Sequence, residues 1–156
     1  MEHTHRYALR LDWTGASQGP TLKYETYSRE YRVAIDGKPV LTGSSDPAFL
    51  GDSALINPED MLLAALSSCH MLSYLALCAR VRIAVTAYTD EASGIMGETA
   101  PRRMGFTEVT LRPRVTVASG TDLAKARALH EKAHEICFIA NSVNFPVRHE
   151  AEIVAG

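Results

Sequence analysis

The sequence predicts a single α+β domain over residues 1–156. Three observations predict it: short segments alternate apolar and polar residues with the period of a strand, two longer segments have helical character, and no repeat or linker divides the chain. The expected order is β-β-β-α-β-β-α-β, in which strands and helices are grouped as in α+β folds. A chain of 156 residues is long enough to bury a substantial core.

The first third of the chain is predicted to form strands. Its alternating segments are 7–13, 22–27, 31–35 and 39–41. A turn-rich break at 14–20 separates the first two, and Asp36-Gly37 between the last two is a hairpin signal. Residues 43–56 are expected to be a long loop.

A long helix is predicted to begin after Asn57 and to end near Arg80. Asn57 suits the N-cap, Pro58 the first helical position and Glu59 the first turn. Residues 61–79 are almost all apolar, which approaches a membrane-spanning length. Polar side chains interrupt the middle of this segment, so we favour the buried centre of a domain or dimer over a membrane span.

The remaining elements follow in the order of the chain. We expect strands at 81–88, resuming near Ile95, and one long strand at 106–117 in which Pro113 marks an edge or a bulge. Thr121 is expected to cap a second helix that runs through His134. A short helix at 137–143 and a last strand at 147–154 complete the prediction.

Composition limits the partners and the compartment. A net charge of −2 gives no reason to expect nucleic acid or an anionic membrane as a partner. The polar start, residues 1–5, has no export signal, and three cysteines without such a signal favour a reducing compartment. We therefore expect a cytoplasmic protein.

Two of the three cysteines lie in settings that suggest thiol chemistry. Cys69 and Cys78 are nine residues apart on one helix, on opposite faces and about 13 Å apart, so they cannot form a disulfide there. Cys78 is thus expected in the core, which leaves Cys137 as the partner available to Cys69. A reactive thiol also needs a nearby cation, and without one Cys69 is simply a buried thiol. Arg29 and Arg32 are the best-placed candidates, although both also fit a solvated strand edge.

These motifs together resemble the OsmC/Ohr family of organic hydroperoxide reductases. The likeness rests on Asn57-Pro58-Glu59, on the Ala/Leu-rich helix that carries Cys69, and on Cys137 followed by Ala140-Asn141-Ser142 and a strand after Pro146. It covers the whole chain. Two features depart from the family pattern: Phe138 stands where a proline commonly follows the second cysteine, and Arg29 lacks the usual glycine-rich surroundings.

The resemblance implies an interlocked homodimer with long central helices wrapped by antiparallel sheets from both subunits, and it implies no cofactor. Cys69 would be the peroxidatic thiol and Cys137 the resolving one. Arg29, held by Glu59, would stabilise the thiolate, with Arg32 as the alternative arginine. Because Glu59 lies about 15 Å from Cys69 along one helix, we expect the glutamate–arginine pair to come from the partner subunit.

The activity that follows is a thiol-dependent peroxidase. Cys69 would reduce an organic hydroperoxide to an alcohol and become a sulfenic acid, which Cys137 would convert to a disulfide. An external dithiol, often a lipoyl group in the family, would then reduce the disulfide. Apolar neighbours such as Met71, Leu72 and Phe138 favour organic hydroperoxides over hydrogen peroxide.

Two interpretations compete with this one. The first is a non-enzymatic dimer of the same fold that binds a small apolar ligand. The second starts from His130-Glu131-Lys132-Ala133-His134, which matches the His-Glu-x-x-His motif of zinc peptidases, with His149, Glu150 or Glu152 as a third ligand. The short, charged helix and the little chain that remains for a substrate cleft favour a solvated helix face over the zinc site.

Overall fold

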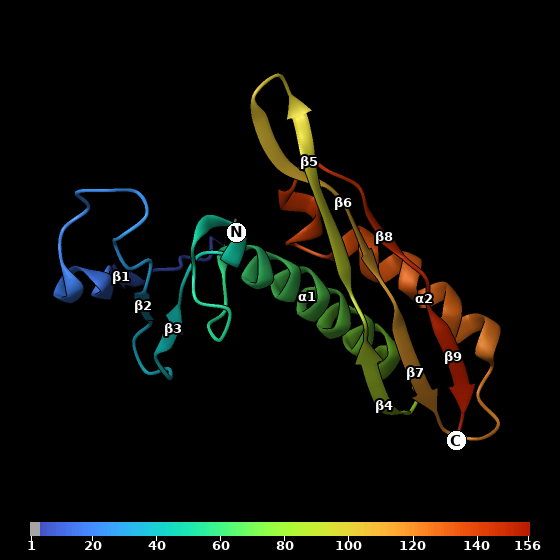
Figure 1. Cartoon of the computed structure of the whole chain (residues 1–156). Helices are drawn as coiled ribbons and strands as arrows, with labels where there is room; N and C mark the ends of the chain where they lie inside the picture. The colour runs from blue at the N-terminus through green and yellow to red at the C-terminus, as the bar shows by residue number, and fades with distance from the viewer. Residues whose placement is uncertain (1–3) are drawn as a thin grey trace. The chain divides into compact units, whose positions relative to one another are not determined.

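A computed structural model describes residues 4–156 of the protein, so the first three residues of the polar start lie outside the described part. The chain forms two compact units: the first ends at Met61 and the second contains Leu62–Gly156. Helices and sheets occur together, which confirms the α+β class (Figure 1). That all 156 residues form one domain stays a prediction.

The first unit contains a small antiparallel sheet in the order β1-β2-β3. Its strands are β1 (Arg10–Asp12), β2 (Tyr31–Ala34) and β3 (Leu41–Gly43). The hairpin between β2 and β3 is confirmed: Gly37 adopts a φ of 71°, a conformation that favours glycine. The strand expected at 22–27 is wrong, because these residues form turns. Short 3₁₀ helices at Thr14–Gln18 and Pro47–Phe49 occupy the connections.

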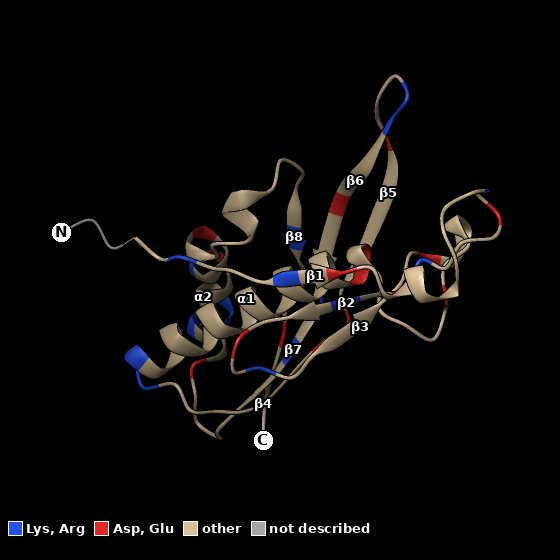
Figure 2. Cartoon of the chain, turned by 90° about the vertical axis from the view of Figure 1, so that its left-hand side faces the viewer, with Lys and Arg blue, Asp and Glu red and all other residues tan. Residues whose placement is uncertain are grey.

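Helix α1 (Pro58–Arg80) has the predicted bounds. Two reciprocal hydrogen bonds cap its start. The Asn57 side-chain oxygen accepts from the Asp60 N–H at 2.8 Å, and the Asp60 carboxylate accepts from the Asn57 N–H at 3.2 Å. This reciprocal pair satisfies two N–H groups that a helix start otherwise leaves unpaired. No charged residue interrupts the helix between Asp60 and Arg80 (Figure 2).

One stripe of α1 belongs to the core of the second unit. Its buried side chains recur every four residues: Leu66, His70, Tyr74 and Cys78. By length and composition alone the helix could also cross a membrane. The buried stripe is instead the pattern of a helix packed on one side, and the rest of its surface is partly or fully exposed.

The second unit contains two sheets and a second helix. One sheet has the order β4-β7-β9 and the other β5-β6-β8. The strands are β4 (Val85–Asp90), β5 (Ser93–Ala100), β6 (Arg103–Leu111), β7 (Pro113–Val117), β8 (Val147–His149) and β9 (Glu152–Ala155). The pairs β4–β7 and β5–β6 are antiparallel, whereas β8 pairs parallel with β6 and β9 parallel with β7. Helix α2 (Leu123–Ile136) precedes the two last strands.

Four expectations for this unit need correction. The long strand at 106–117 is two strands in different sheets, and Pro113, which has no N–H for a ladder, begins the second. The last strand at 147–154 is likewise divided into β8 and β9. The cap of α2 is Asp122 rather than Thr121, because its carboxylate accepts from the Lys125 N–H at 3.0 Å. The short helix expected at 137–143 is smaller than predicted: only Ala140–Ser142 form a 3₁₀ turn there.

Two apolar clusters form the interior of the second unit. One gathers Tyr74 and Cys78 of α1 with residues of β7, α2 and β9, which confirms Cys78 as a core residue. The other surrounds Leu66 with Val109 and Leu111 of β6. The segment that follows Cys137 packs onto this second cluster through Ile139, Ala140 and Val143. That packing fixes the second cysteine beside α1.

Candidate active site

The two cysteines predicted to work together are brought together by the second unit. Cys69 lies midway along α1 and is half-buried, whereas Cys137 caps the C-terminal end of α2 and is 1% exposed. Cys69 lies close enough to Cys137 to raise the pKa of that thiol, and both thiols are free. Two elements nearly seventy residues apart in sequence thus meet at a pair of thiols.

The environment of the two thiols differs. Burial, and to a smaller extent the neighbouring Cys69, raises the pKa of Cys137 to about 11, while the backbone N–H groups of Ala140 and Ile139 act to lower it. Cys137 is therefore a protonated thiol at neutral pH. Cys69 is the more accessible of the pair, so a reagent from solvent reaches it first.

Arg29 lies in an aromatic pocket of the first unit. Its guanidinium stacks on the ring of Tyr27 at 3.9 Å and on that of Tyr24 at 4.9 Å, and it donates to the backbone carbonyls of both residues. Its Nε is buried without a hydrogen-bond partner among the described residues. The pocket has a volume of about 390 Å³ and is lined by Leu11, Trp13, Thr21, Tyr27, Arg29, Tyr31, Ser44, Ser45 and Pro58.

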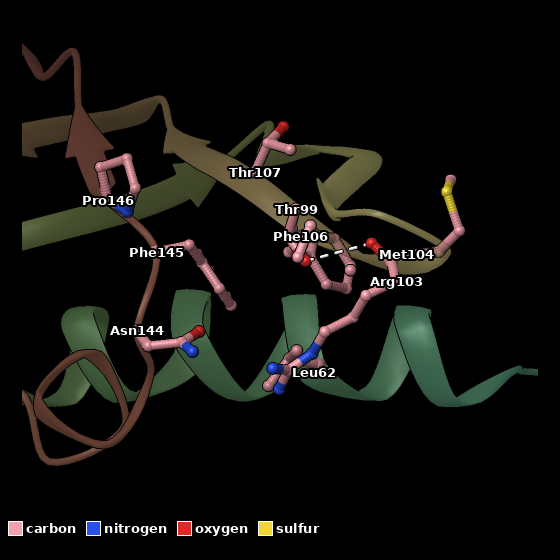
Figure 3. A pocket seen from close by; sticks show the side chains of 11 residues that line it. Leu62, Thr99, Arg103, Met104, Phe106, Thr107, Asn144, Phe145 and Pro146 are labelled. Carbon is pink, nitrogen blue, oxygen red and sulfur yellow. Dashed lines mark hydrogen bonds between the residues drawn. The ribbon is translucent and has the colours of Figure 1, made fainter.

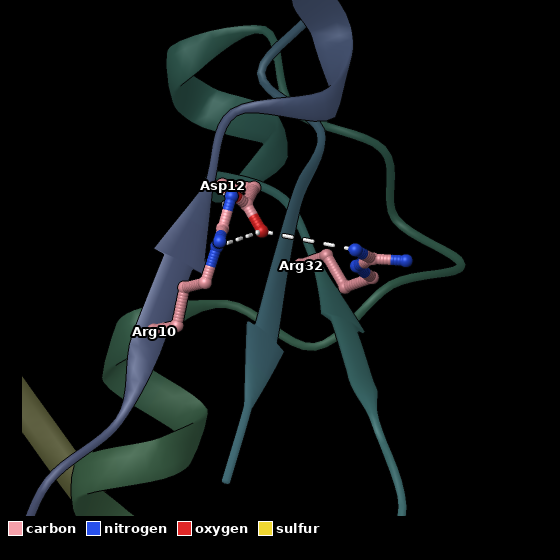
Figure 4. A network of polar contacts seen from close by, with 3 residues as sticks. All are labelled: Arg10, Asp12 and Arg32. Atoms are coloured by element: carbon pink, nitrogen blue, oxygen red, sulfur yellow. Dashed lines mark hydrogen bonds and ion pairs between the residues drawn. The ribbon is translucent and has the colours of Figure 1, made fainter.

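Arg32, the alternative arginine, is engaged elsewhere. It lies opposite Asp12 in the β1–β2 register, and its guanidinium approaches the Asp12 carboxylate at 3.7 Å (Figure 4). Arg10 holds the same carboxylate at 2.9 Å. Arg32 is therefore part of a surface ion-pair network, whereas Arg29 lines a pocket.

Glu59 is near the pocket of Arg29 but does not bind the arginine here. It is half-buried in the first turn of α1. The pKa of Tyr31, a residue of the pocket wall, is raised first by the burial of Tyr31 and next by the charge of Glu59. No ion pair joins Glu59 to Arg29 within residues 4–156, because the guanidinium donates to carbonyls instead. The predicted Glu59–Arg29 pair stays a prediction.

A buried histidine pair is the feature that the sequence did not predict. His70 of α1 and His130 of α2 are 1% and 0% exposed, and their rings share a hydrogen bond of 3.0 Å between Nε2 and Nδ1. Tyr74 stacks on His130 at 3.9 Å, and His149 of β8 lies 5.4 Å from His70. Burial lowers the pKa of His70 to about 4 and that of His130 to about 3, with neighbouring histidines adding to the effect.

The histidine pair includes His130, the first histidine of the His-Glu-x-x-His motif. His130 points into the core and binds His70, so the expectation of a fully solvated helix face is wrong for this residue. Glu131 is exposed and approaches His149 at 3.4 Å. Within the described residues, no group of three or more His, Cys, Asp or Glu side chains has the geometry to hold a metal ion.

Known proteins share this sequence pattern and fold. Residues 51–152 match the family of OsmC-like proteins. An OsmC-like protein of unknown function from Vibrio cholerae O1 biovar eltor str. N16961 is 35% identical, with a TM-score of 0.87 over 96% of this chain and 100% of its own. The uncharacterised protein YmaD of Bacillus subtilis (strain 168) is 25% identical over 97% of each chain.

The fold extends to proteins with a stated role in hydroperoxide resistance. An organic hydroperoxide resistance protein from Elizabethkingia anophelis superposes with a TM-score of 0.69 over 100% of both chains at 20% identity, which is a likeness of fold. The family match covers about two thirds of the sequence and agrees with the paired thiols and the capped α1. The chain therefore belongs to the OsmC-like protein family.

Proposed function

We propose that this protein is a thiol-dependent peroxidase that reduces organic hydroperoxides, with Cys69 as the nucleophile and Cys137 as the resolving thiol. The observation that carries the proposal is the contact between an accessible thiol and a buried one. Membership of the OsmC-like family, which shares its fold with organic hydroperoxide resistance proteins, supports the same chemistry.

The asymmetry of the pair assigns the two roles. The Cys69 thiolate attacks the terminal peroxide oxygen, the O–O bond breaks, and the alkoxide takes a proton and leaves as the alcohol. Cys69 is then a sulfenic acid. Cys137, kept protonated by its raised pKa of about 11, does not compete for peroxide. Its sulfur then attacks the sulfenic acid, its proton leaves with the hydroxyl as water, and a Cys69–Cys137 disulfide forms.

An external dithiol completes the cycle. It reduces the disulfide by two thiol–disulfide exchanges, becomes a disulfide itself and returns both cysteines to thiols. We propose a lipoyl group as the physiological dithiol. The cycle needs no metal or cofactor, and the reducing conditions it requires fit the cytoplasmic location we propose.

The cation that activates Cys69 is proposed to be Arg29 of the partner subunit. Its guanidinium would stabilise the thiolate and the developing alkoxide, and Glu59 would replace the backbone carbonyls as its partner when the dimer forms. Two observations support a homodimer: Leu72 on α1 is 62% exposed, and this helix has no charge over its middle five turns. Because Arg32 is held by Asp12, Arg29 is the arginine proposed for the site.

The test is consumption of tert-butyl hydroperoxide with dithiothreitol or dihydrolipoamide as reductant. The wild type should turn over, and Cys69→Ser should not. Cys137→Ser should complete about one turnover per subunit and then react slowly, because the resolving thiol is missing. Its Cys69 should then carry a sulfenic acid that a sulfenic-acid-specific reagent labels. Cys78→Ala is the matched control, because this core thiol lies away from the pair and its loss should leave the activity intact.

Either of two results would contradict the proposal. One is activity in Cys69→Ser equal to the wild type. The other is a wild type that consumes no peroxide with either dithiol and forms no Cys69–Cys137 disulfide after oxidation. The second outcome would favour the non-enzymatic dimer that binds a small apolar ligand.

A further inference from the structure

A second pocket is lined only by residues of the second unit. It has a volume of about 580 Å³, in the range of small-molecule sites. The β5–β6 hairpin forms one wall, the first turns of α1 a second, and the loop before β8 a third (Figure 3). Neither the thiols nor Arg29 belong to its lining.

The wall of this pocket is apolar and partly aromatic. Phe106 and Phe145 form a tilted ring pair with centroids 5.5 Å apart, and Leu62 of α1 packs with both on the same cluster. Pro146 extends this surface. Such a wall removes an alkyl chain or a ring from water, which is the main source of affinity for apolar ligands.

One positive charge faces this wall. Arg103 is the sole charged residue among those that line the pocket in the described chain, and Figure 3 shows its side chain extending from the hairpin toward Leu62. Within residues 4–156 its guanidinium has no ion pair, although five other arginines and a lysine do. Asn144 adds an amide at the opposite side of the pocket.

The backbone holds Arg103 at this position. The hydroxyl of Thr99 donates to the Arg103 carbonyl at 3.2 Å across the hairpin (Figure 3). Arg102, its neighbour in the turn, has a φ of 62° and does not line the pocket. The two consecutive arginines therefore differ in position although both are exposed.

We propose that this pocket binds a small amphipathic carboxylate, with its apolar body on Leu62, Phe106 and Phe145 and its carboxylate on Arg103. A single guanidinium offers a planar fork that matches a carboxylate in geometry and neutralises its one charge. A phosphate monoester would bring a second charge, for which the lining has no cation. The proposed contacts are not those of the thiol pair, because none of the residues that line the pocket is a cysteine.

The test is isothermal titration of octanoate and decanoate, with 1-decanol and decyl phosphate as comparison ligands. Decanoate should bind more tightly than octanoate, by up to about fourfold for each methylene that becomes buried. It should also bind about tenfold more tightly than 1-decanol, because a charge-assisted hydrogen bond is lost in the alcohol. Cys69→Ser should bind decanoate as the wild type does, which separates this site from the peroxidase proposal.

Two variants locate the carboxylate. Arg103→Gln should remove the preference for decanoate over 1-decanol, while Arg102→Gln, the matched control one residue away, should keep it. Absence of decanoate binding to the wild type at millimolar concentration would overturn the proposal. So would an equal loss in both arginine variants, which would indicate diffuse surface charge, or tighter binding of decyl phosphate than of decanoate.

Discussion

Mild acid should destabilise this protein through His70 and His130. Both imidazoles are buried and neutral, and burial, aided by the neighbouring His149, holds their pKa values at about 4 and about 3. His134 adds to the effect on His70, and Arg127 adds to that on His130. In the unfolded chain both side chains titrate near the ordinary histidine pKa of about 6.5.

The sign follows from which state binds more protons. Below pH 6.5 the unfolded chain takes up a proton at each of these histidines while the folded protein does not, so the free energy of unfolding falls as the pH falls. The stabilisation is complete above pH 6.5 and is lost between there and about pH 4, where His70 also titrates in the folded state. Each histidine contributes about 1.4 kcal/mol per pH unit in this interval.

Between pH 7 and pH 5 the expected loss is about 2 kcal/mol for each histidine and about 4 kcal/mol for the pair. That is a large part of the roughly 5–15 kcal/mol that stabilises a typical domain. The assay is urea unfolding followed by circular dichroism at both pH values and constant ionic strength. Carboxylates also titrate in this interval, so the quantity to compare is the difference between the wild type and variants.

The double variant His70→Gln/His130→Gln should lose about 4 kcal/mol less than the wild type between the two pH values, whatever its stability at pH 7. If it does not fold, the single variant His70→Gln should recover about half of that difference. His5→Gln is the control, because this exposed histidine is not among the groups that affect the pKa of His70 or His130, and it should behave as the wild type. An unchanged pH dependence in the double variant would refute the reasoning, as would wild-type imidazole NMR signals assigned to His70 and His130 that titrate near pH 6.5.

Three further predictions concern packing and the proposed site. Leu66→Ala should lower the free energy of unfolding by about 2–5 kcal/mol in urea titrations, because Leu66 is 0% exposed and its removal leaves a cavity; a loss below about 1 kcal/mol would contradict that packing. Gly43→Ala should destabilise by about 1–3 kcal/mol, since the added Cβ would lie 2.4 Å from the Tyr31 ring; an unchanged urea midpoint would contradict this contact. Arg29→Ala should reduce kcat/KM for tert-butyl hydroperoxide at least about 100-fold, as for a lost transition-state cation, while Arg32→Ala stays within about threefold, and the reverse order would reassign the arginine.

The elements that the sequence predicted well are those with local signals. The start of α1 depends on Asn57, Pro58 and Asp60, which lie together in the chain and interact with one another in the structure. The β2–β3 hairpin likewise depends on Gly37 in its own turn. Such contacts require no knowledge of the rest of the fold.

The errors arise where contacts with residues outside an alternating segment decide its structure. Residues 22–27 alternate like a strand, but they form turns, and the carbonyls of Tyr24 and Tyr27 accept hydrogen bonds from the Arg29 guanidinium. The segment 106–117 alternates throughout, yet it divides at Arg112 and Pro113 because its two halves join different sheets. Periodicity shows which side chains share a face, and it does not show which strand lies beside which.

The candidate site also contains residues that the sequence could identify and residues that it could not. Cys69 and Cys137 could be predicted as a pair because the helix spacing excludes Cys78 as the partner of Cys69. The structure places the two cysteines close together. The His70–His130 pair joins residues 60 apart, and neither histidine has a neighbour in sequence that indicates the other. The partner of Arg29 could not be found from one chain, because the proposed site needs a second subunit.

The parallel pairings of β8 with β6 and of β9 with β7 constrain how the protein can be made. Each pairing joins residues 38 apart in the sequence, with all of α2 between them. While a ribosome is still synthesising α2, the edges of β6 and β7 that will receive these strands are bare, and bare edges are sites where nascent chains associate wrongly. Both sheets close only when residues 147–155 have left the ribosomal tunnel, so the second unit completes its folding after nearly all of it has been translated.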